Sequence, residues 1–410
     1  MLKFKEYQNI LNEAAINKHM THLEDSILIL GSKGIIFVNS VMQDFLEKFS
    51  GSSTMKNTTT TVKFDGAPAI WAGHDPITGE FFVGTKSMFN ASPKINYTES
   101  DVENNHKGGL ADTLKVALKE LKPIWPMGLI LQGDVMFTNS TKNRETIDGD
   151  SYVTFQPNTL KYAVPASGNA AKDITSANFG IVFHTTYTGA NLQNLSANFG
   201  ADVSLIKKSK SAWVQNADYQ ITGEANFDSS EKSQFAKLLK ASQSQSAAID
   251  KGFIDDVMSN SQFNMMIQTH FNSRIRKGEI VTDPKAHMKD FYNWLELKQS
   301  KEIEKLKSVK GKEKKALTHK EINKIIKSKE KSLIMLFTYQ KTVIDMKEMI
   351  ITKLNKIKNI SVFVEKTPGN YSVTNQEGFT AVDKLSGEAV KLVSRLEFSA
   401  NNFNIPKNWK

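Results

Sequence analysis

A lysine at the end of a predicted strand is the side chain of this sequence best placed for covalent chemistry. Lys63 ends a β-branched stretch and is followed by Phe64, Asp65 and Gly66, the pattern of a strand that enters a tight turn. A lysine amine is protonated at neutral pH, so attack on phosphorus requires neighbours that assist its deprotonation and hold it in line with the leaving group. The tetrad Lys-x-Asp-Gly therefore indicates a candidate amine nucleophile, although an ordinary turn at the end of a strand can have the same four residues.

Four later segments carry the other side chains that such chemistry needs. In Leu129–Phe137 an apolar run is interrupted by Gly133 and Asp134, which predicts a buried strand with one carboxylate facing a cleft. A second core strand is predicted over Phe179–Tyr187, which is rich in aromatic and β-branched residues. Two segments far downstream contribute a further carboxylate and a further cation, namely Gln376–Val382 with Glu377 and Ala389–Val393 with Lys391.

With these blocks in this order, the chain resembles the covalent nucleotidyltransferase superfamily, which contains ATP-dependent DNA and RNA ligases and mRNA capping enzymes. The resemblance implies that Lys63 attacks the α-phosphate of a nucleoside triphosphate and carries the nucleotide as a phosphoramidate. It implies ATP as the nucleotide and Mg²⁺ or Mn²⁺ as the cation. It also implies an α+β fold, the ligase adenylation domain, in which antiparallel sheets are flanked by helices.

The resemblance assigns a role to each matching residue. Asp134 stands where the family has a glutamate near the ribose and the metal, and Glu377 would help to hold the same metal. Phe183 would stack on the base, and Lys391 would contact the α-phosphate. The implied nucleotide-binding set is completed by the neighbours of the nucleophile, Val62, Asp65 and Gly66.

Three positions depart from the family pattern. Pro68 replaces an arginine that often follows the first block, Asp134 replaces a glutamate, and the last block lacks a clean Lys-x-Lys. Lys86, at the end of a strand predicted to pair with the one after Lys63, could supply the missing positive charge. The chain is also similar to a family of tailed-phage proteins without assigned activity, a likeness carried by Leu23–Asp25 and Thr154–Asn158 as well.

Composition favours an intracellular globular enzyme. The 410 residues are 40% hydrophobic, enough for a sizeable core and two or three domains. The sequence has neither an apolar run of about 18 residues nor a signal-peptide core, so we expect no membrane partner and a place in the cytoplasm, the host cytoplasm if a phage encodes the chain. With no cysteine, disulfides and thiolate zinc sites are excluded, and oxygen or imidazole ligands must hold any metal.

Most of the net charge of +10 lies in one segment. Between Lys298 and Lys331 there are 13 lysines against 5 glutamates, and the apolar residues recur at helical spacing. We expect two helices, which could pair as a hairpin, with a break at Gly311. Either this is a solvated face or it grips a phosphate backbone through residues such as Lys310, Lys312, Lys314 and Lys315.

The pattern along the chain predicts an interrupted catalytic domain. Residues 1–52 form a helical segment, and residues 53–228 the first part of the nucleotidyltransferase domain. Residues 229–358 form a helical, lysine-rich insertion, and residues 359–410 complete the domain. The stretch after Lys391 is too short for a C-terminal OB-fold, which favours an RNA-ligase-like protein over a DNA ligase. The insertion is expected near the rim of the site, as a substrate clamp or as a docking surface for another protein.

Three functions remain open at this point. The first is an active enzyme that transfers AMP from Lys63 to a nucleic-acid end, RNA rather than DNA. The second is a degenerate relative that binds a nucleotide or nucleic acid without covalent chemistry, and the third is a structural or host-interaction phage protein. Six histidines, His184 among them, show no paired metal-ligand spacing and are expected to be structural or solvated.

Overall fold

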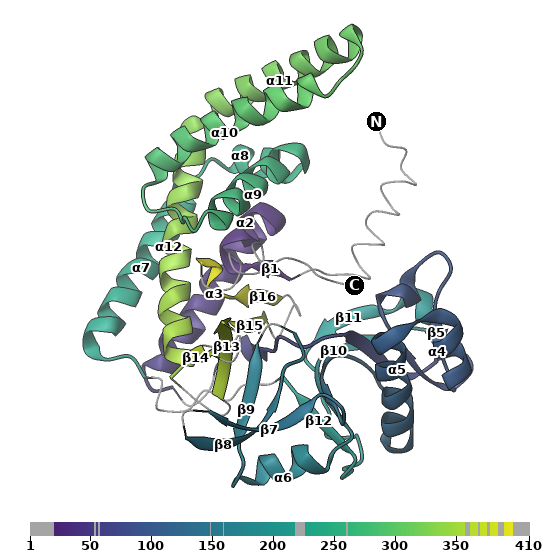
Figure 1. Ribbon diagram of the computed structural model, residues 1–410. Helices are drawn as coiled ribbons and strands as arrows, with labels where there is room; N and C mark the ends of the chain where they lie inside the picture. Colours follow the sequence, from purple (N-terminus) through teal and green to yellow (C-terminus); the bar gives the residue numbers. More distant parts are fainter. Residues whose placement is uncertain are drawn as a thin grey trace. The chain divides into compact units, whose positions relative to one another are not determined.

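The computed structural model describes residues 20–52, 55, 58–147, 149–158, 160–217, 226–259, 261–356, 361–367, 370–374, 378–383 and 389–396. Over these residues the chain is an α+β protein with mainly antiparallel sheets and several helices, which confirms the predicted fold class (Figure 1). The chain divides into two compact units. The strand-rich unit comprises Met1–Met20, Thr59–Ile221 and Ile357–Ala389, and the helical unit comprises Thr21–Thr58, Thr222–Lys356 and Val390–Lys410.

The larger sheet of the strand-rich unit has the strand order β11-β10-β6-β3-β4-β5, and β12 pairs with β10 in parallel. Its strands are β3 (Ala69–His74), β4 (Phe81–Gly84), β5 (Ile95–Asn96), β6 (Ile130–Thr138), β10 (Phe179–Thr188), β11 (Ser196–Phe199) and β12 (Ala212–Asn216). In the register of this sheet Asp134 on β6 lies between Ala69 on β3 and Val182 on β10. The central strands of the sheet therefore surround Asp134.

One face of this sheet is covered by the helices α4 (Glu99–Asn105) and α5 (Gly108–Leu121). Leu114 and Leu118 on α5 pack in the same core as Ile70 and Phe183 from the strands. The predicted helix over residues 109–122 is therefore confirmed, and it ends where Pro123 enters the short 3-10 helix η3 (Lys122–Ile124). With this face filled by core side chains, residues of the opposite strand face are the ones available to line a pocket.

A second sheet of the same unit has the order β14-β13-β9-β8-β7. Its strands are β7 (Lys142–Ile147), β8 (Asp150–Phe155), β9 (Lys161–Pro165), β13 (Ser361–Thr367) and β14 (Asn370–Thr374), with α6 (Asn169–Ser176) against β8 and β9. β13 pairs with β9 in antiparallel orientation, so two strands on either side of the long helical stretch of sequence are neighbours in one sheet. The unit also contains β2 (Thr58–Lys63), β15 (Gly378–Asp383) and the 3-10 helices η2 (Lys86–Phe89) and η4 (Leu192–Asn194).

The helical unit is built from segments at both ends of the chain and from the insertion. Its helices are α2 (Ser26–Leu30), α3 (Ser32–Phe49), α7 (Ser229–Ala248), α8 (Lys251–Ser259), α9 (Ser261–Arg276), α10 (Pro284–Glu304), α11 (Val309–Ser328) and α12 (Glu330–Leu354), with the 3-10 helix η1 (Leu23–Asp25). Phe37, Val41, Phe45 and Phe49 form a buried stripe on α3, as their spacing predicts. The sequence predicted residues 1–52 as a segment of their own, whereas α3 packs against α7 and Phe227 donates its N–H to the carbonyl of Phe49 (2.7 Å).

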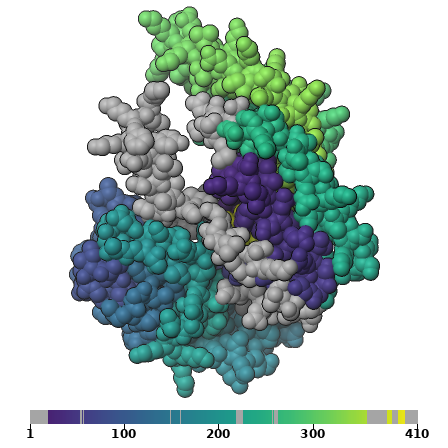
Figure 2. Space-filling view, turned by 180° about the vertical axis from the view of Figure 1, so that it is seen from behind, coloured from purple at the N-terminus to yellow at the C-terminus, as the bar shows by residue number. Residues whose placement is uncertain are grey.

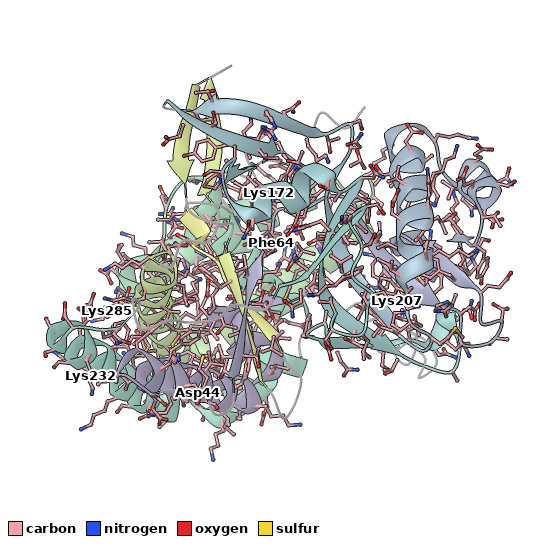
Figure 3. All side chains as sticks on the ribbon, turned by 90° about the horizontal axis from the view of Figure 1, so that it is seen from below. Asp44, Phe64, Lys172, Lys207, Lys232 and Lys285 are labelled. Carbon is pink, nitrogen blue, oxygen red and sulfur yellow. The ribbon has the colours of Figure 1, made fainter. Side chains whose placement is uncertain are left out.

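The lysine-rich segment forms a helical hairpin, α10 followed by α11, at one end of the helical unit (Figures 1 and 2). The side chains of Gln299 and Asn323 exchange two hydrogen bonds across it (2.9 and 3.0 Å). The predicted break at Gly311 is wrong, because Ser308 caps α11 by accepting the N–H of Gly311 (3.1 Å), which places that glycine in the first turn. Exposed lysines occur outside the lysine-rich segment too, as Lys232 on α7 and Lys285 in the first turn of α10 show (Figure 3).

A buried network of charges joins η1, α12 and the residues after β16 (Ala389–Leu392) in the helical unit. Lys347 donates to both carboxylate oxygens of Glu24 (3.0 and 2.8 Å), and both side chains are 0% exposed. Arg395 contacts Glu24 (3.4 Å) and Asp25 (3.1 Å). Burial would raise the pKa of Glu24, but Lys347 and Arg395 outweigh it and lower that pKa to about 2. For Asp25 burial prevails over the attraction of Arg395 and raises the pKa to about 6.

Candidate functional site

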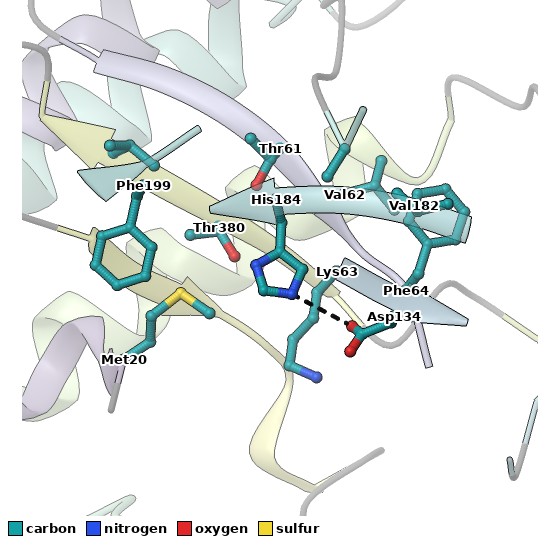
Figure 4. A pocket seen from close by; sticks show the side chains of 12 residues that line it. Met20, Thr61, Val62, Lys63, Phe64, Asp134, Val182, His184, Phe199 and Thr380 are labelled. Atoms are coloured by element: carbon teal, nitrogen blue, oxygen red, sulfur yellow. Dashed lines mark ion pairs between the residues drawn. The ribbon is translucent and has the colours of Figure 1, made fainter. Parts of the chain in front are cut away.

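A pocket of about 480 Å³, part of it open solvent, lies in the strand-rich unit (Figure 4). The polar side chains of its lining are Thr61, Lys63, Asp134, His184 and Thr380. The apolar lining consists of Met20, Val62, Phe64, Val182, Phe199, Ala217 and Val382. A polar cluster and an apolar wall in one cavity suit a ligand with a charged part and an aromatic part.

Lys63 is the last residue of β2, and the backbone around it is held in place. The N–H of Val62 donates to the carbonyl of Ala217 (2.7 Å), and the N–H of Ala217 donates to the carbonyl of Phe183 on β10 (2.9 Å). The strand that ends in the lysine is thereby tied to the strand that contributes Val182 and His184 to the pocket. A fixed backbone lets the lysine side chain be positioned at little entropic cost.

Asp65 supports the turn after Lys63. Its carboxylate accepts hydrogen bonds from the Asn158 side chain (2.8 Å) and from the N–H of Leu160 (2.9 Å). Its own N–H donates to the hydroxyl of Tyr162 (2.7 Å). These contacts join the Lys-x-Asp-Gly turn to the segment around Asn158. In this structure the carboxylate of Asp65 therefore fixes the backbone that presents Lys63.

Gly66 is required by the close approach of its turn to β6. A Cβ atom at this position would lie 2.5 Å from the Cβ of Asp134, a separation that real Cβ atoms essentially never show. On either side of that contact, the N–H of Ala67 donates to the carbonyl of Val135, and the N–H of Val135 donates to the carbonyl of Pro68 (both 3.0 Å). The turn that follows the lysine thus packs directly against the strand that carries the aspartate.

Asp134 and His184 face each other in the pocket (Figure 4). The Nε2 atom of His184 lies 3.7 Å from Oδ2 of Asp134, and the two side chains are 24% and 23% exposed. On its other side, Nδ1 of His184 lies 2.8 Å from the Thr185 hydroxyl. The sequence predicted a structural or solvated histidine at position 184, whereas His184 lines the pocket. Alternation along β10 is the signal that finds it, because a core residue at 183 turns 182 and 184 toward the opposite face.

Phe183 is not in the pocket, contrary to its implied role on the base. The side chain is 0% exposed and belongs to the core beneath α5, with its ring centroid 5.3 Å from that of Trp125 in an edge-to-face arrangement. A strand sends successive side chains to opposite faces, and β10 points Val182 and His184 into the pocket instead. The aromatic side chains that do line the pocket are Phe64 and Phe199.

The other predicted residues are placed as follows. Lys86 begins η2 as an exposed residue outside the pocket lining, although β4 does pair with β3 as predicted. Lys391 belongs to β16 in the helical unit, opposite His22 of β1 (Thr21–His22). Glu377 lies outside the described residues. The structure thus brings Val62, Lys63 and Asp134 together and leaves Lys86 and Phe183 apart from them.

Metal binding within the described part of the chain must rest on few side chains. No group of three or more His, Asp or Glu residues there could hold an ion. The predicted pair of Asp134 and Glu377 is represented only by Asp134, whose carboxylate lies in the pocket. Oxygen from Asp134 and nitrogen from His184 are the donors available for a divalent cation there, so the donor chemistry fits one.

Fold and site together define an α+β protein with a lysine and a His–Asp pair in one pocket. The chain belongs to a family of unknown function (DUF6267), whose model matches residues 17–407. No curated protein matches the chain. No solved structure matches it either. Among the described residues no helix is both long and apolar enough to cross a membrane.

Proposed function

We propose that the protein is an ATP-dependent nucleotidyltransferase that forms a lysyl-AMP intermediate at Lys63, on a strand-rich unit with the ligase adenylation fold. The observation that carries the proposal is the common pocket of Lys63 and Asp134, two residues far apart in the sequence. Their sequence motifs alone single out the same two residues. A nucleic-acid end, RNA rather than DNA, is the acceptor in this proposal.

The chemistry of the first step balances with the residues present. The amine of Lys63 forms a nitrogen–phosphorus bond with the α-phosphate, the bond to pyrophosphate breaks, and its electron pair leaves with the pyrophosphate. The lysine ammonium gives up two protons to water and pyrophosphate in reaching the phosphoramidate. A divalent cation held by Asp134 and His184 would neutralise charge on the phosphate oxygens. Fixing the turn through Asp65 and Gly66 keeps the lysine aimed during this exchange.

The distribution of the pocket lining gives the nucleotide a direction. Figure 4 shows Phe199 and Met20 together at one end, and Lys63 and Asp134 on the far side of His184 from them. Phosphates require the cationic end, and a purine base gains most from an apolar, aromatic wall. We therefore place the base against Phe199 and Met20 and the triphosphate beside Lys63.

Covalent labelling tests the proposal directly. The protein is incubated with ATP labelled at the α-phosphate and with Mg²⁺ or Mn²⁺, denatured, and separated by electrophoresis. We expect a labelled band that is lost in acid and stable in base, as a phosphoramidate is. ATP labelled at the γ-phosphate should leave no band. A folded protein that binds ATP but never acquires the α-label is instead the degenerate nucleotide-binding protein. The features favouring that alternative are Pro68 and Asp134 at positions where relatives carry arginine and glutamate.

Replacing Asp134 with asparagine should slow label formation by about 2–4 kcal/mol of transition-state free energy, or about 30- to 1,000-fold in rate. The reason is that one charged oxygen facing the phosphates and their cation is removed while side-chain volume is kept. The rate is measured per folded molecule, with circular dichroism and the melting temperature as checks of the fold. Unchanged labelling in a well-folded variant would make Asp134 a structural residue. Glu377→Gln, predicted for the same cation, should produce a loss of similar size.

The acceptor is proposed to meet the hairpin α10–α11. Lys310, Lys312 and Lys314 on α11 are exposed, whereas Lys315 forms an ion pair with Glu302 (2.9 Å) and His319 contacts the same carboxylate (3.2 Å). Three exposed ammonium groups at the start of one helix suit a phosphate backbone, because binding by counterion release requires charge and no base-specific contact. The alternative, a structural or host-interaction protein, would use the exposed Leu317 and Val309 of the same helix to dock another protein.

Substitution of Lys310, Lys312 and Lys314 by glutamine should weaken single-stranded RNA binding for every sequence tested. For each phosphate group that the variant no longer neutralises, the slope of log affinity against log salt should fall by about 0.7. Lys315→Gln alone should change that slope less, since Glu302 already compensates its charge. Fluorescence anisotropy over a range of salt concentrations measures both. An unchanged slope in the triple variant assigns the hairpin to solvent or to protein docking, and labelling of Lys63 should be unaffected in either case.

A further inference from the structure

We propose that His184 is a direct ligand of the catalytic cation, together with Asp134, and that the pocket consequently prefers Mn²⁺ to Mg²⁺. The inference deepens the proposed function and rests on it for the use of the cation, although binding of the cation can be measured without any nucleotide. Neither the sequence motifs nor the family resemblance assigns a role to His184.

The spacing of the His184 and Asp134 side chains suits two ligands of one cation. Nε2 of His184 and Oδ2 of Asp134 are 3.7 Å apart, longer than an ordinary hydrogen bond between nitrogen and oxygen. Two ligands bound to one ion at about 2.1 Å lie roughly 3.0–3.5 Å from each other. A shift of a few tenths of an ångström therefore brings both atoms to one cation. Their exposure, 24% and 23%, leaves each reachable from the pocket.

The other ring nitrogen of His184, Nδ1, has a fixed partner in Thr185. A ligating histidine usually donates its other ring N–H to a fixed acceptor, which selects the tautomer. Here Nδ1 lies 2.8 Å from the hydroxyl of Thr185, which is 2% exposed. When Nδ1–H donates to this hydroxyl, the lone pair of Nε2 faces the carboxylate of Asp134. Two electron-pair donors then face one another, an arrangement that a cation between them stabilises.

The strands hold this pair of ligands in position. Gly200 donates its N–H to the carbonyl of His184 (2.8 Å), which ties β10 to the end of β11. On β6, Gly133 has no room for a Cβ atom, because that atom would lie 2.5 Å from the carbonyl oxygen of Val182. The close approach of β6 to β10 at this point sets the separation of Asp134 from His184. With two ligands from the protein, phosphate oxygens and water must complete the coordination.

The donor types decide the metal. Mg²⁺ favours oxygen ligands in near-ideal octahedral geometry, whereas imidazole is a ligand of first-row transition ions. Of the two cations that the sequence suggests, Mn²⁺ is the one that accepts a mixed set of oxygen and nitrogen. We therefore expect Mn²⁺ to bind the pocket in the absence of nucleotide. A tenfold excess of Mg²⁺ should displace the bound Mn²⁺ only partly.

The test uses the intact protein and Mn²⁺ without nucleotide. Histidine ring resonances are followed by NMR, because bound Mn²⁺ broadens the signals of nearby protons. The His184 signal, assigned with His184→Gln, should broaden at a Mn²⁺ concentration at least tenfold below that needed for His74. His74 is the matched internal control, a β3 residue of the same sheet outside the pocket lining. Asp134→Asn should remove the difference between the two histidines.

Failure of this inference and failure of the proposed function give different results. If His184 broadens no earlier than His74, or if Asp134→Asn leaves the broadening unchanged, the histidine is not a ligand, whatever the labelling shows. If selective broadening occurs and no α-label forms on Lys63, the cation site stands and the nucleotidyltransferase is wrong. Electron paramagnetic resonance of free Mn²⁺ measures the affinity of the protein for Mn²⁺ independently. This affinity should fall about tenfold or more in both His184→Gln and Asp134→Asn.

Discussion

Lys63→Arg should retain the fold and lose covalent labelling completely. The arginine side chain keeps the positive charge that attracts the triphosphate, but its guanidinium stays protonated at any pH the protein survives and cannot attack phosphorus. Labelling with ATP carrying the label at its α-phosphate, followed by denaturation, measures the loss. Noncovalent binding of an ATP analogue with a methylene group between the α- and β-phosphates should change far less, because the pocket and its charge remain.

Lys172→Arg is the matched control, since Lys172 is an exposed residue of α6 in the same unit and outside the pocket lining. Its labelling should equal that of the wild type. Mass spectrometry of the labelled protein should locate AMP on the peptide that contains Lys63. Label at the wild-type level in Lys63→Arg, or recovery of the nucleotide on another lysine, would exclude Lys63 as the nucleophile.

Local patterns predicted the elements of the fold well, and for physical reasons. The apolar stripe from Phe37 to Phe49 requires one buried helix face, Pro123 ends a helix, and the β-branched run after residue 360 pairs as a strand. What local patterns lack is the partner of each buried face. The grouping of residues 21–58 with 222–356 depends on packing of α3 against α7, and on the hydrogen bond from Phe227 to Phe49, which join remote parts of the sequence.

The same limit explains which site residues could be predicted. Lys63 ends a β-branched strand and Asp134 interrupts an apolar one, so each is visible in the sequence as a charged residue at the margin of a core pattern. Choosing between Phe183 and its neighbours requires the phase of β10, which two register irregularities, one between Gly180 and Ile181 and one between Phe183 and Thr185, make hard to follow. Alternation can turn His184 to the same face as Val182, but its position opposite Asp134 depends on the pairing of β10 with β6.

Glu24→Gln should destabilise the helical unit by about 3–5 kcal/mol, the cost of leaving a buried charge without its opposite partner. The substitution keeps the volume of the side chain but removes the carboxylate that Lys347 contacts at 3.0 and 2.8 Å, with both residues 0% exposed. Denaturation in urea, followed by circular dichroism of the helices, gives the free energy of unfolding. The matched control is Asp345→Asn on α12, the helix that carries Lys347. It breaks a partly exposed ion pair with Lys341 and should lower the free energy of unfolding by no more than about 1 kcal/mol.

A second variant separates the broken ion pair from a general packing defect. Glu24→Gln combined with Lys347→Met should be more stable than Glu24→Gln alone, because the double variant has no unpaired ammonium to bury. The pH dependence gives an independent check. Since the folded-state pKa of Glu24 is about 2, the stability that its charge supplies is complete above about pH 4.5 and is lost as the pH falls toward 2. In Glu24→Gln the free energy of unfolding should therefore depend less on pH in that window than it does in the wild type. The opposite result would be a double variant less stable than both Glu24→Gln and Lys347→Met, with the loss of stability below pH 4.5 unchanged in Glu24→Gln. Glu24 and Lys347 would then contribute through packing alone, and their charges would not be what stabilises this part of the helical unit.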